Sequence, residues 1–245
     1  AKVHADWPSV PVVSEPKHLF NDPNIDLIVI PTPNDTHFPL AKAALEAGKH
    51  VVIDKPFTVT LSQARELDAL AKSLGRLLSV FHNRRWDSDF LTVKRLLSEG
   101  TLGEILFFES HFDRFRPQVR NRWREQAGPG SGIWYDLAPH LLDQAVNLFG
   151  LPVSMTVDLA QLRPGAQTTD YFHAVLSYPQ RRIMLHGTMV AAAESARYII
   201  HGTRGSYVKF GLDPQEDRLK NGERLPQEDW GYDMRDGVVT RVEGE

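Results

Sequence analysis

The sequence contains no cysteine, and this absence limits the chemistry that the chain can carry. Without thiols it forms no disulfide, and no metal site can be built on thiolate ligands. Long apolar runs are also missing, and none approaches the roughly 20 residues that a membrane-spanning helix needs. A net charge of −3 over 245 residues offers no broad attraction for nucleic acid or for an anionic membrane surface. Neither kind of partner is therefore expected.

The residues that are present have the composition of a globular protein. Hydrophobic residues make up 42% and charged residues 24% of the chain, which is typical of a folded domain. The length fits one large domain or two modest ones. No internal repeat and no low-complexity tract interrupts the chain.

The first third of the chain has the pattern of a βαβ unit. Leu27–Ile30 is a short, β-branched apolar run, which predicts a strand buried on both faces. Asp35 or Thr36 is expected to cap the helix that follows, and Gly48 is expected to end it in a left-handed conformation. His50–Ile53 predicts the second strand. Ligands bind such parallel sheets at the carboxyl ends of their strands.

Lys55 follows the second expected strand directly, so it is a candidate for binding a substrate oxygen. The alternative is an ordinary solvated lysine in a loop. A capping box at Thr60–Gln63 and a leucine stripe (Leu67, Leu70 and Leu74) predict the next helix, and Leu77–Phe81 predicts a third parallel strand. Because crossovers in such sheets are right-handed, the strand ends at Pro31, Lys55 and Asn83 are expected to line one edge.

The pattern changes near residue 83, where a domain boundary is expected. An amphipathic helix over Asp89–Leu97 and a strand over Ile105–Phe112 follow it. Later β-rich runs are separated by turns, with no helical pattern between them, which indicates an antiparallel sheet. These runs are Ser154–Leu162, Tyr171–Ser177, Ile183–Met189, Tyr198–His201 and Tyr207–Phe210.

A glycine-rich run from Gly128 to Gly132 precedes another helix with a polar stripe. Pro139 is tolerated only in the first turn of a helix, so Asp136 is expected at its start. The stripe consists of Asp136, His140, Asp143 and Asn147, opposite the inward-facing Leu137, Leu141 and Leu148.

Three interpretations of this stripe stay open from the residues alone. Asp136 caps the helix while His140 is a surface histidine, or Asp136, His140 and Asp143 bind a metal ion on one helical face. No cysteine and no H-E-x-x-H motif supports the second, and no metal ligand is assigned. In the third, His140 carries a proton, because its reference pKa of about 6.5 suits that task at neutral pH.

Arginines crowd the segment before the glycine-rich run, with Trp123 among them. They are Arg114, Arg116, Arg120, Arg122 and Arg124. Arginines with an interleaved aromatic residue suit phosphates and bases, but the chain as a whole is acidic, which speaks against nucleic acid. A solvated loop paired with neighbouring acids is the ordinary alternative.

These motifs together resemble the glucose–fructose oxidoreductase and inositol dehydrogenase (Gfo/Idh/MocA) family. In that family one strand ends in P-N-x-x-H and the next in E-K-P, and here the runs are Pro33–His37 and Asp54–Pro56. The glycine-rich stretch is similar to the family's G-G-x-x-x-D-x-G-x-H-x-x-D motif, with Asp136 and His140 at the catalytic positions and Ala138 replacing the middle glycine. Trp123–Arg124 is similar to a W-R pair that borders the nicotinamide and substrate in several members.

The resemblance implies an α/β fold with two domains. Residues 1–82 would form an incomplete Rossmann-type parallel-sheet domain that binds a dinucleotide. Residues 83–245 would form an α+β domain for substrate binding and oligomerisation, with a large, mostly antiparallel sheet. No G-x-G-x-x-G follows an expected strand, and the chain begins with Ala1. We therefore expect a fragment that enters after the first βαβ unit, lacking roughly 40–50 residues.

The resemblance also implies an activity and the residues that carry it. The expected reaction is NAD- or NADP-dependent hydride transfer to or from a sugar, polyol or related hydroxy/keto compound. Lys55 would polarise the substrate oxygen, His140 would exchange its proton, and Asp136 would orient the histidine. The residues expected to contact the cofactor are Pro31, Thr32, Asn34, His37, Asp54, Lys55, Pro56, Asn83, Trp123 and Arg124. The competing hypothesis is a non-catalytic ligand-binding or regulatory member of the same fold.

The β-rich half is also expected to join subunits. Tyr171–Leu176 and Ile183–Met189 carry apolar residues on both alternating faces, and the helix Asp136–Phe149 can cover only one of them. An apolar face left open favours a homodimer or homotetramer packed sheet against sheet, as the resemblance also implies. A cytoplasmic location is expected for such an enzyme.

Overall fold

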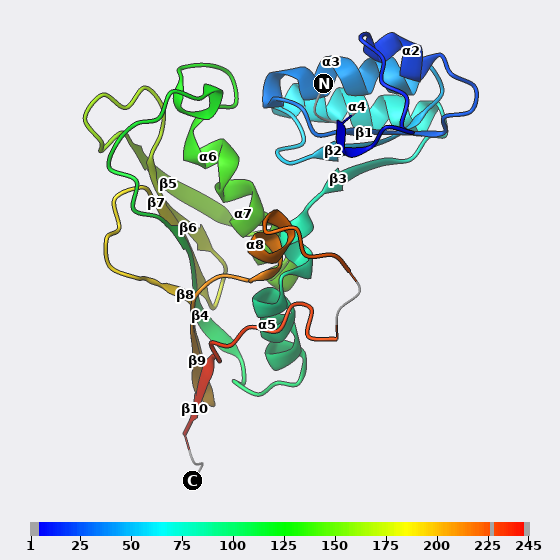
Figure 1. Ribbon diagram of the computed structural model, residues 1–245. Coiled ribbons are helices and arrows are strands. Elements are labelled where there is room, and N and C mark those ends of the chain that lie inside the picture. Colours follow the sequence, from blue (N-terminus) through cyan, green and yellow to red (C-terminus); the bar gives the residue numbers. More distant parts are fainter. Residues whose placement is uncertain (1–4, 226–227, 243–245) are drawn as a thin grey trace. The chain divides into compact units, whose positions relative to one another are not determined.

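The computed structural model describes residues 5–225 and 228–242, and the chain divides into two compact units (Figure 1). Unit 1 ends at Phe81 and unit 2 begins at His82. Each unit is built on a sheet of its own with a separate hydrophobic core. Within the described residues, no helix has the length and apolar character to cross a membrane.

Unit 1 is a three-stranded parallel sheet in the order β1-β2-β3, as predicted. Its strands are β1 (Leu27–Ile30), β2 (His50–Asp54) and β3 (Leu78–Phe81). The helices are α2 (Pro16–Phe20), α3 (Asn34–Glu46) and α4 (Leu61–Ser73). Helices α3 and α4 connect the strands and lie on the same side of the sheet (Figure 1).

The core of unit 1 lies between its helices and one face of the sheet. Leu45 and Leu67 are fully buried there, as the helical periodicity predicts. The prediction that the first strand is buried on both faces is wrong, because Leu27 and Val29 are 48% and 61% exposed. The helices cover one face only, so the alternate residues of β1 stay open.

The helix ends of unit 1 follow the sequence signals in part. Thr60 and Gln63 form the predicted capping box, and Gly48 after α3 has a φ of 79°. The predicted cap of α3 is wrong: Pro33 holds the N-cap position without a side-chain bond, so Asp35 and Thr36 lie inside the first turn.

Unit 2 is built on a seven-stranded sheet in the order β10-β9-β8-β4-β7-β6-β5. All neighbours are antiparallel except β4 and β7, which confirms a mostly antiparallel sheet. The strands are β4 (Ile105–Asp113), β5 (Ser154–Ala160), β6 (Tyr171–Ser177), β7 (Arg182–Thr188), β8 (Ala196–Gly202), β9 (Gly205–Phe210) and β10 (Val238–Arg241). The short α8 (Gln215–Lys220) and β10 carry no signal that the sequence analysis recognised.

The remaining helices of unit 2 include the two that carry the glycine-rich motif. The remaining helices are the 3₁₀ turns η1 (Asn83–Trp86) and η2 (Trp123–Glu125), and the α-helices α5 (Ser88–Ser98), α6 (Gly132–Asp136) and α7 (Ala138–Phe149). The motif residues Asp136 and His140 lie on α6 and α7. Helix α7 packs against β7 and buries Leu141 and Ala145 in the main core with Phe108 and Phe172.

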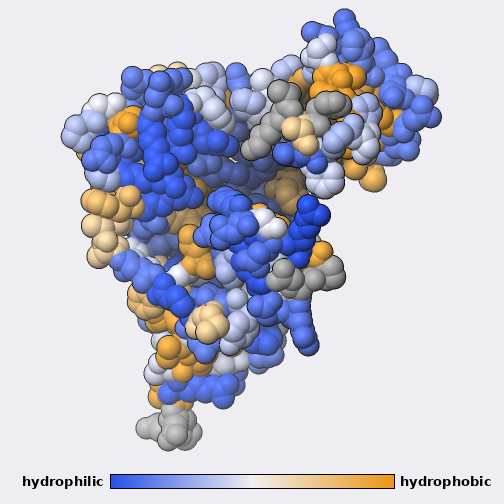
Figure 2. Space-filling model, in the orientation of Figure 1, coloured by the Kyte–Doolittle hydropathy of each residue, from blue (hydrophilic) through white to orange (hydrophobic). Residues whose placement is uncertain are grey.

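The other face of the large sheet carries the alternating residues. Val175, Met184 and Ile199 stand on it, as expected for an apolar surface, and each is half-buried. Histidines stand among them, however, including His111 and His186, which pair across β4 and β7. This face is therefore mixed in character rather than uniformly apolar. Figure 2 shows hydrophobic residues in separate patches on the face of the molecule turned to the viewer.

Candidate functional site

The carboxyl ends of the unit 1 strands meet at one edge of the sheet. Ile30 pairs with Ile53, and Asp54 pairs with Phe81, so all three strands end within a residue or two of each other. This is the edge at which dinucleotides bind in open parallel sheets. The segments that follow β1 and β2 contain most of the residues expected to contact the cofactor.

His37 ties the ends of β1 and β2 together. Its Nδ1 lies 2.8 Å from the carbonyl oxygen of Pro56, and its Nε2 lies 2.9 Å from the carbonyl oxygen of Thr32. The side chain is fully buried. These two contacts give His37 a positioning role between the strand ends, and its contact with a cofactor stays a prediction. His37 also holds the two candidate cofactor segments side by side.

Lys55 follows β2 and is half-buried. Its backbone N–H donates to Oδ1 of Asp54 over 2.8 Å, so the carboxylate of the D-K-P run orders the backbone at the strand end. The Lys55–Pro56 peptide bond is cis. This edge of the sheet fits a dinucleotide, because dinucleotides bind at the carboxyl ends of parallel strands and Lys55 adds an ammonium there.

In unit 2, the glycine-rich motif forms two helices rather than one. Asp136 is the last residue of α6, Leu137 separates the helices, and Pro139 lies in the first turn of α7. Asp136 therefore does not cap α7. The interpretation of His140 as a surface histidine is also wrong, since it is only 6% exposed.

Phe112 packs against His140, and Arg197 packs against Phe112 in turn. Its ring meets the edge of Phe112, with centroids 6.1 Å apart and planes at 85°. The guanidinium of Arg197 lies 4.1 Å from the centroid of the same Phe112 ring. One turn further along α7, Gln144 accepts a hydrogen bond from Arg197 over 3.0 Å. Arg197 and Phe112 thus fix the first turns of α7, from which His140 projects.

The third residue of the stripe, Asp143, contacts Arg85 and His82 of its own unit. Arg85 donates hydrogen bonds from Nε and Nη2 to the two carboxylate oxygens of Asp143, over 2.7 and 2.5 Å. His82 Nε2 lies 3.7 Å from Oδ1 of the same carboxylate. A bidentate arginine occupies the oxygens that a metal ion would need. This arrangement disfavours the metal interpretation of Asp136, His140 and Asp143.

The arginine-rich segment is partly neutralised within unit 2. Arg124 Nε lies 3.3 Å from Oδ1 of Asp136, and its guanidinium stacks 4.4 Å from the centroid of Trp123. Arg122 pairs with the buried Glu125. Burial lowers the pKa of Arg114, and the neighbouring Arg84 adds to that effect while Asp136 opposes it. Arg122 and Arg124 thus act as partners of particular carboxylates, in line with the paired-loop alternative.

Some residues of the region escaped the sequence analysis. Arg85, which holds Asp143, was not singled out, because its partner lies on a helix much later in the chain. A second group on the open sheet face, His111, Asp113 and His186, was missed as well. The alternation of His111 and Asp113 along one strand was a visible signal, but the pairing with His186 depends on strand order.

Models of one oxidoreductase family match almost the whole chain. Residues 1–82 match the "Oxidoreductase family, NAD-binding Rossmann fold" domain of the Gfo/Idh/MocA family. Residues 94–244 match the "Oxidoreductase family, C-terminal alpha/beta domain" of the same family. The expectation of a nicotinamide cofactor is confirmed at this level, because the matched domain is the NAD-binding one.

Individual proteins agree with the family match. The uncharacterized oxidoreductase YdgJ of Escherichia coli is 89% identical over all of this chain and 70% of its own length. The scyllo-inositol 2-dehydrogenase (NADP(+)) IolW of Bacillus subtilis is 42% identical, over 99% of this chain and 68% of its own. The structure of a Yersinia pestis oxidoreductase has a TM-score of 0.93 and 72% identity, with coverage of 99% and 68%. The chain therefore belongs to the Gfo/Idh/MocA oxidoreductase family.

Proposed function

We propose that this chain carries the catalytic residues of an NAD- or NADP-dependent dehydrogenase or reductase that acts on CH–OH groups. The substrate class is a sugar, a polyol or a related hydroxy/keto compound. Residues 1–82 would bind the dinucleotide and residues 83–245 the substrate, and a cytoplasmic location is part of the proposal. The similarity to IolW, a scyllo-inositol 2-dehydrogenase (NADP(+)), supports this substrate class.

The observation that carries the proposal is the position of Lys55. It directly follows β2, on the edge where parallel sheets bind dinucleotides, and the strand ends around it are tied by His37. An ammonium held there can donate a hydrogen bond to the substrate oxygen that gains or loses negative character during the reaction.

His140 is the proposed proton carrier. When bound, the nicotinamide supplies or accepts the hydride, so one proton must still move to or from the substrate oxygen. His140 is held by α7 and by the Phe112 ring, which limits its rotation. A histidine suits proton exchange at neutral pH. Asp136 and the paired Arg124 would lie beside it as orienting charges.

Lys55→Met tests the proposal. In the purified protein, supplied with both cofactors and a panel of sugars and polyols, we expect turnover to fall by orders of magnitude while cofactor affinity changes little. Lys42→Met is the matched control, because Lys42 lies on α3 of the same unit and forms its ion pair with the surface residue Glu66. Near-normal turnover in Lys55→Met would refute its role. Cofactor binding without turnover in the wild type on every substrate would favour a non-catalytic ligand-binding protein.

His140→Asn tests whether His140 exchanges the proton of the substrate oxygen. We expect turnover to fall by about 10²–10⁴-fold and the histidine limb of the pH–rate profile to flatten. If that limb persists unchanged, another group carries the proton. Chelators are expected to leave turnover intact, since no step of the proposed reaction uses a metal ion.

We also propose that two or four copies assemble through the open face of the large sheet. Half-buried apolar residues such as Val175, Met184 and Ile199 support this, because a second sheet would cover them. Light scattering should give a dimer or tetramer, and Met184→Glu should dissociate it. A monomer at all working concentrations would contradict the assembly.

A further inference from the structure

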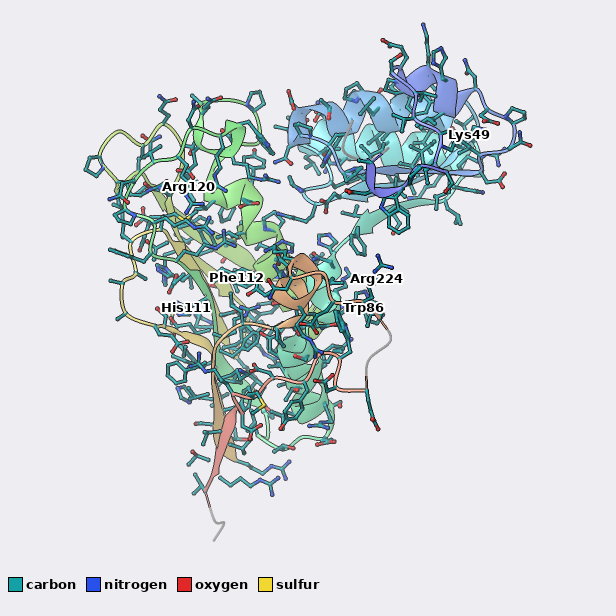
Figure 3. The ribbon with its side chains drawn as sticks, viewed as in Figure 1. Lys49, Trp86, His111, Phe112, Arg120 and Arg224 are labelled. Carbon is teal, nitrogen blue, oxygen red and sulfur yellow. The ribbon has the colours of Figure 1, made fainter. Side chains whose placement is uncertain are left out.

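Three histidines form a row across adjacent strands of the large sheet. His173 on β6 pairs with His186 on β7, which pairs in turn with His111 on β4. Asp113 stands two residues beyond His111, so both side chains project from the same face of β4. Figure 3 shows His111 on the side of the sheet opposite the helices, whereas its neighbour Phe112 lies on the helix side. The cluster is therefore separate from His140, which contacts Phe112.

The donor atoms of three of these residues converge. His111 Nδ1 lies 2.9 Å from Oδ2 of Asp113, and His186 Nε2 lies 3.6 Å from Oδ1 of Asp113. One ligand atom from each of the three lies within 4.8 Å of the others. With metal–ligand bonds of about 2.0–2.1 Å, donor atoms around a tetrahedral ion stand roughly 3.3 Å apart. The two separations from Asp113, which involve its two different oxygens, lie on either side of that value.

Asp113 supplies an independent indication that a ligand is missing. Its side chain is only 8% exposed, and its Oδ1 is buried without a hydrogen-bond partner. A buried carboxylate oxygen left without a partner is costly, and such atoms are rare in folded proteins. This oxygen faces His186 Nε2 at a distance too long for a hydrogen bond, so a small cation between them would satisfy both atoms.

We propose that His111 Nδ1, Asp113 and His186 Nε2 bind a divalent transition-metal ion on the open face of the large sheet. Two imidazoles and one carboxylate suit zinc, and the same set with open positions also suits iron(II). The shared chemistry is a first-row divalent ion with three protein ligands and at least one position for water or another small ligand.

The groups behind the ligands have the arrangement that metal-binding histidines require. Glu109 Oε1 lies 2.7 Å from His111 Nε2, the nitrogen that faces away from Asp113. His173 Nδ1 lies 3.4 Å from His186 Nδ1, the nitrogen of His186 that faces away from the site. Such partners fix the orientation of ligating histidines and strengthen metal binding.

A cavity of about 620 Å³ gives access to the site. His111 and Asp113 line it, together with Arg114, Arg197 and Arg235. In a single subunit an ion bound at the cluster would thus be reachable through this cavity, whose lining carries the acids Glu194, Asp213 and Asp217 as well as the arginines.

A proton on His111 is the competing occupant. Burial opposes its charged form, but the hydrogen bonds with Asp113 and Glu109 outweigh burial and raise the pKa of His111. A proton accounts for those two short contacts. A proton on His111 leaves Oδ1 of Asp113 without a partner, with His186 Nε2 3.6 Å from that oxygen. A metal ion bound between these two atoms accounts for this arrangement as well as for the two short contacts.

The first experiment uses the wild-type protein alone. The protein is stripped with a chelator, and Zn²⁺ and, anaerobically, Fe²⁺ are titrated by calorimetry at pH 7.5. We expect saturable binding of one ion per chain, and the two titrations distinguish zinc from iron. Co²⁺ added to the stripped protein should give the intense visible absorption of a four-coordinate site. No saturable binding of any of these ions would overturn the proposal.

Variants then locate the ion. His111→Ala and His186→Ala should each weaken binding by at least about 100-fold, and Glu109→Gln by about 10–100-fold. His201→Ala is the control, because His201 lies on β8 of the same sheet, bonded to Ser206 and outside the cluster. Circular dichroism checks that each variant is folded. Equal affinity in wild type, His111→Ala and His186→Ala, or an equal loss in His201→Ala, would refute the assignment.

Discussion

The two units hold their buried polar side chains in different ways. In unit 1, His37 and Lys49 are bound by backbone carbonyls: His37 contacts Thr32 and Pro56, and Lys49 Nζ donates to Asp22 and Ile25 over 2.6 Å each. In unit 2, buried arginines are bound by carboxylates on other elements. Arg163 Nε lies 2.9 Å from Asp170, and Arg197 Nε lies 3.2 Å from Asp89.

Because of this difference, the two units should lose different amounts of stability when a buried polar side chain is removed. A carbonyl is neutral, so the loss of its side-chain partner leaves an unsatisfied dipole but no buried charge. A buried carboxylate that loses its arginine keeps a charge in a medium of low dielectric, which costs much more. Unit 2 should therefore respond more strongly than unit 1 to the loss of one polar side chain, and also to pH.

The largest effect is expected for Arg197→Met in unit 2. Arg197 is 2% exposed and also donates to Ser110 and Gln144, so its removal strands Asp89 and several acceptors. The free energy of unfolding should fall by about 3–5 kcal/mol in chemical denaturation. The exposed Arg224, labelled in Figure 3, supplies the control Arg224→Met, which should stay near wild type. A loss below that of a typical surface substitution would contradict the view that buried ion pairs hold unit 2.

The pH dependence of unit 2 should come partly from Asp87. Burial raises the pKa of Asp87 to about 7, with Asp89 and Asp213 adding to the effect and Arg84 opposing it. The folded state thus keeps the proton to higher pH than the unfolded chain, whose carboxyl releases it near 3.8. The stabilisation is complete below that value and is lost as pH rises through about 7.

Asp87→Asn should remove this dependence. Between pH 4 and pH 8, wild type should lose about 2–4 kcal/mol of unfolding free energy relative to the variant, since one pKa unit corresponds to about 1.36 kcal/mol. Denaturant titrations at several pH values measure it. Asp217→Asn is the control, because its side chain is 83% exposed. Parallel pH curves for wild type and Asp87→Asn would exclude Asp87 as the source.

The same contrast explains what could be predicted from the sequence. The capping box at Thr60 and the position of Lys55 after a strand depend on residues close in the chain, and both have the geometry that the local pattern indicates. The pairing of His111 with His186 depends on β4 lying parallel to β7, which no local pattern encodes. Arg197 reads as an ordinary polar residue in a strand until α5 and α7 are packed against it.

The prediction that β1 is buried on both faces was wrong for a related reason. A continuous apolar run such as Leu27–Ile30 has the same composition whether one or both faces are covered. Which faces are covered depends on where the helices pack, and α3 and α4 lie on one side only (Figure 1). The residue types of a strand therefore indicate that burial is favourable. How much of the strand is buried depends on the arrangement of the neighbouring elements.

The smallest effect is expected for His37→Leu in unit 1. Leucine fills much of the buried space but donates to neither Thr32 nor Pro56, so the carbonyl of Pro56 loses its buried partner. The free energy of unfolding should fall by about 1–3 kcal/mol, less than for Arg197→Met, because no charge is left behind. Hydrogen exchange should place the loss at the ends of β1 and β2.

His18→Leu supplies the matched control, since His18 lies exposed on α2 of the same unit. Because His37 holds the segments after β1 and β2 together, cofactor affinity should also weaken in His37→Leu, whereas Arg224→Met in unit 2 should leave it unchanged. A loss as large as that of Arg197→Met would mean that unit 1 depends on His37 for more than two backbone contacts. Wild-type stability and wild-type cofactor affinity together would mean that the strand ends keep their places without it, and that the backbone alone positions Lys55.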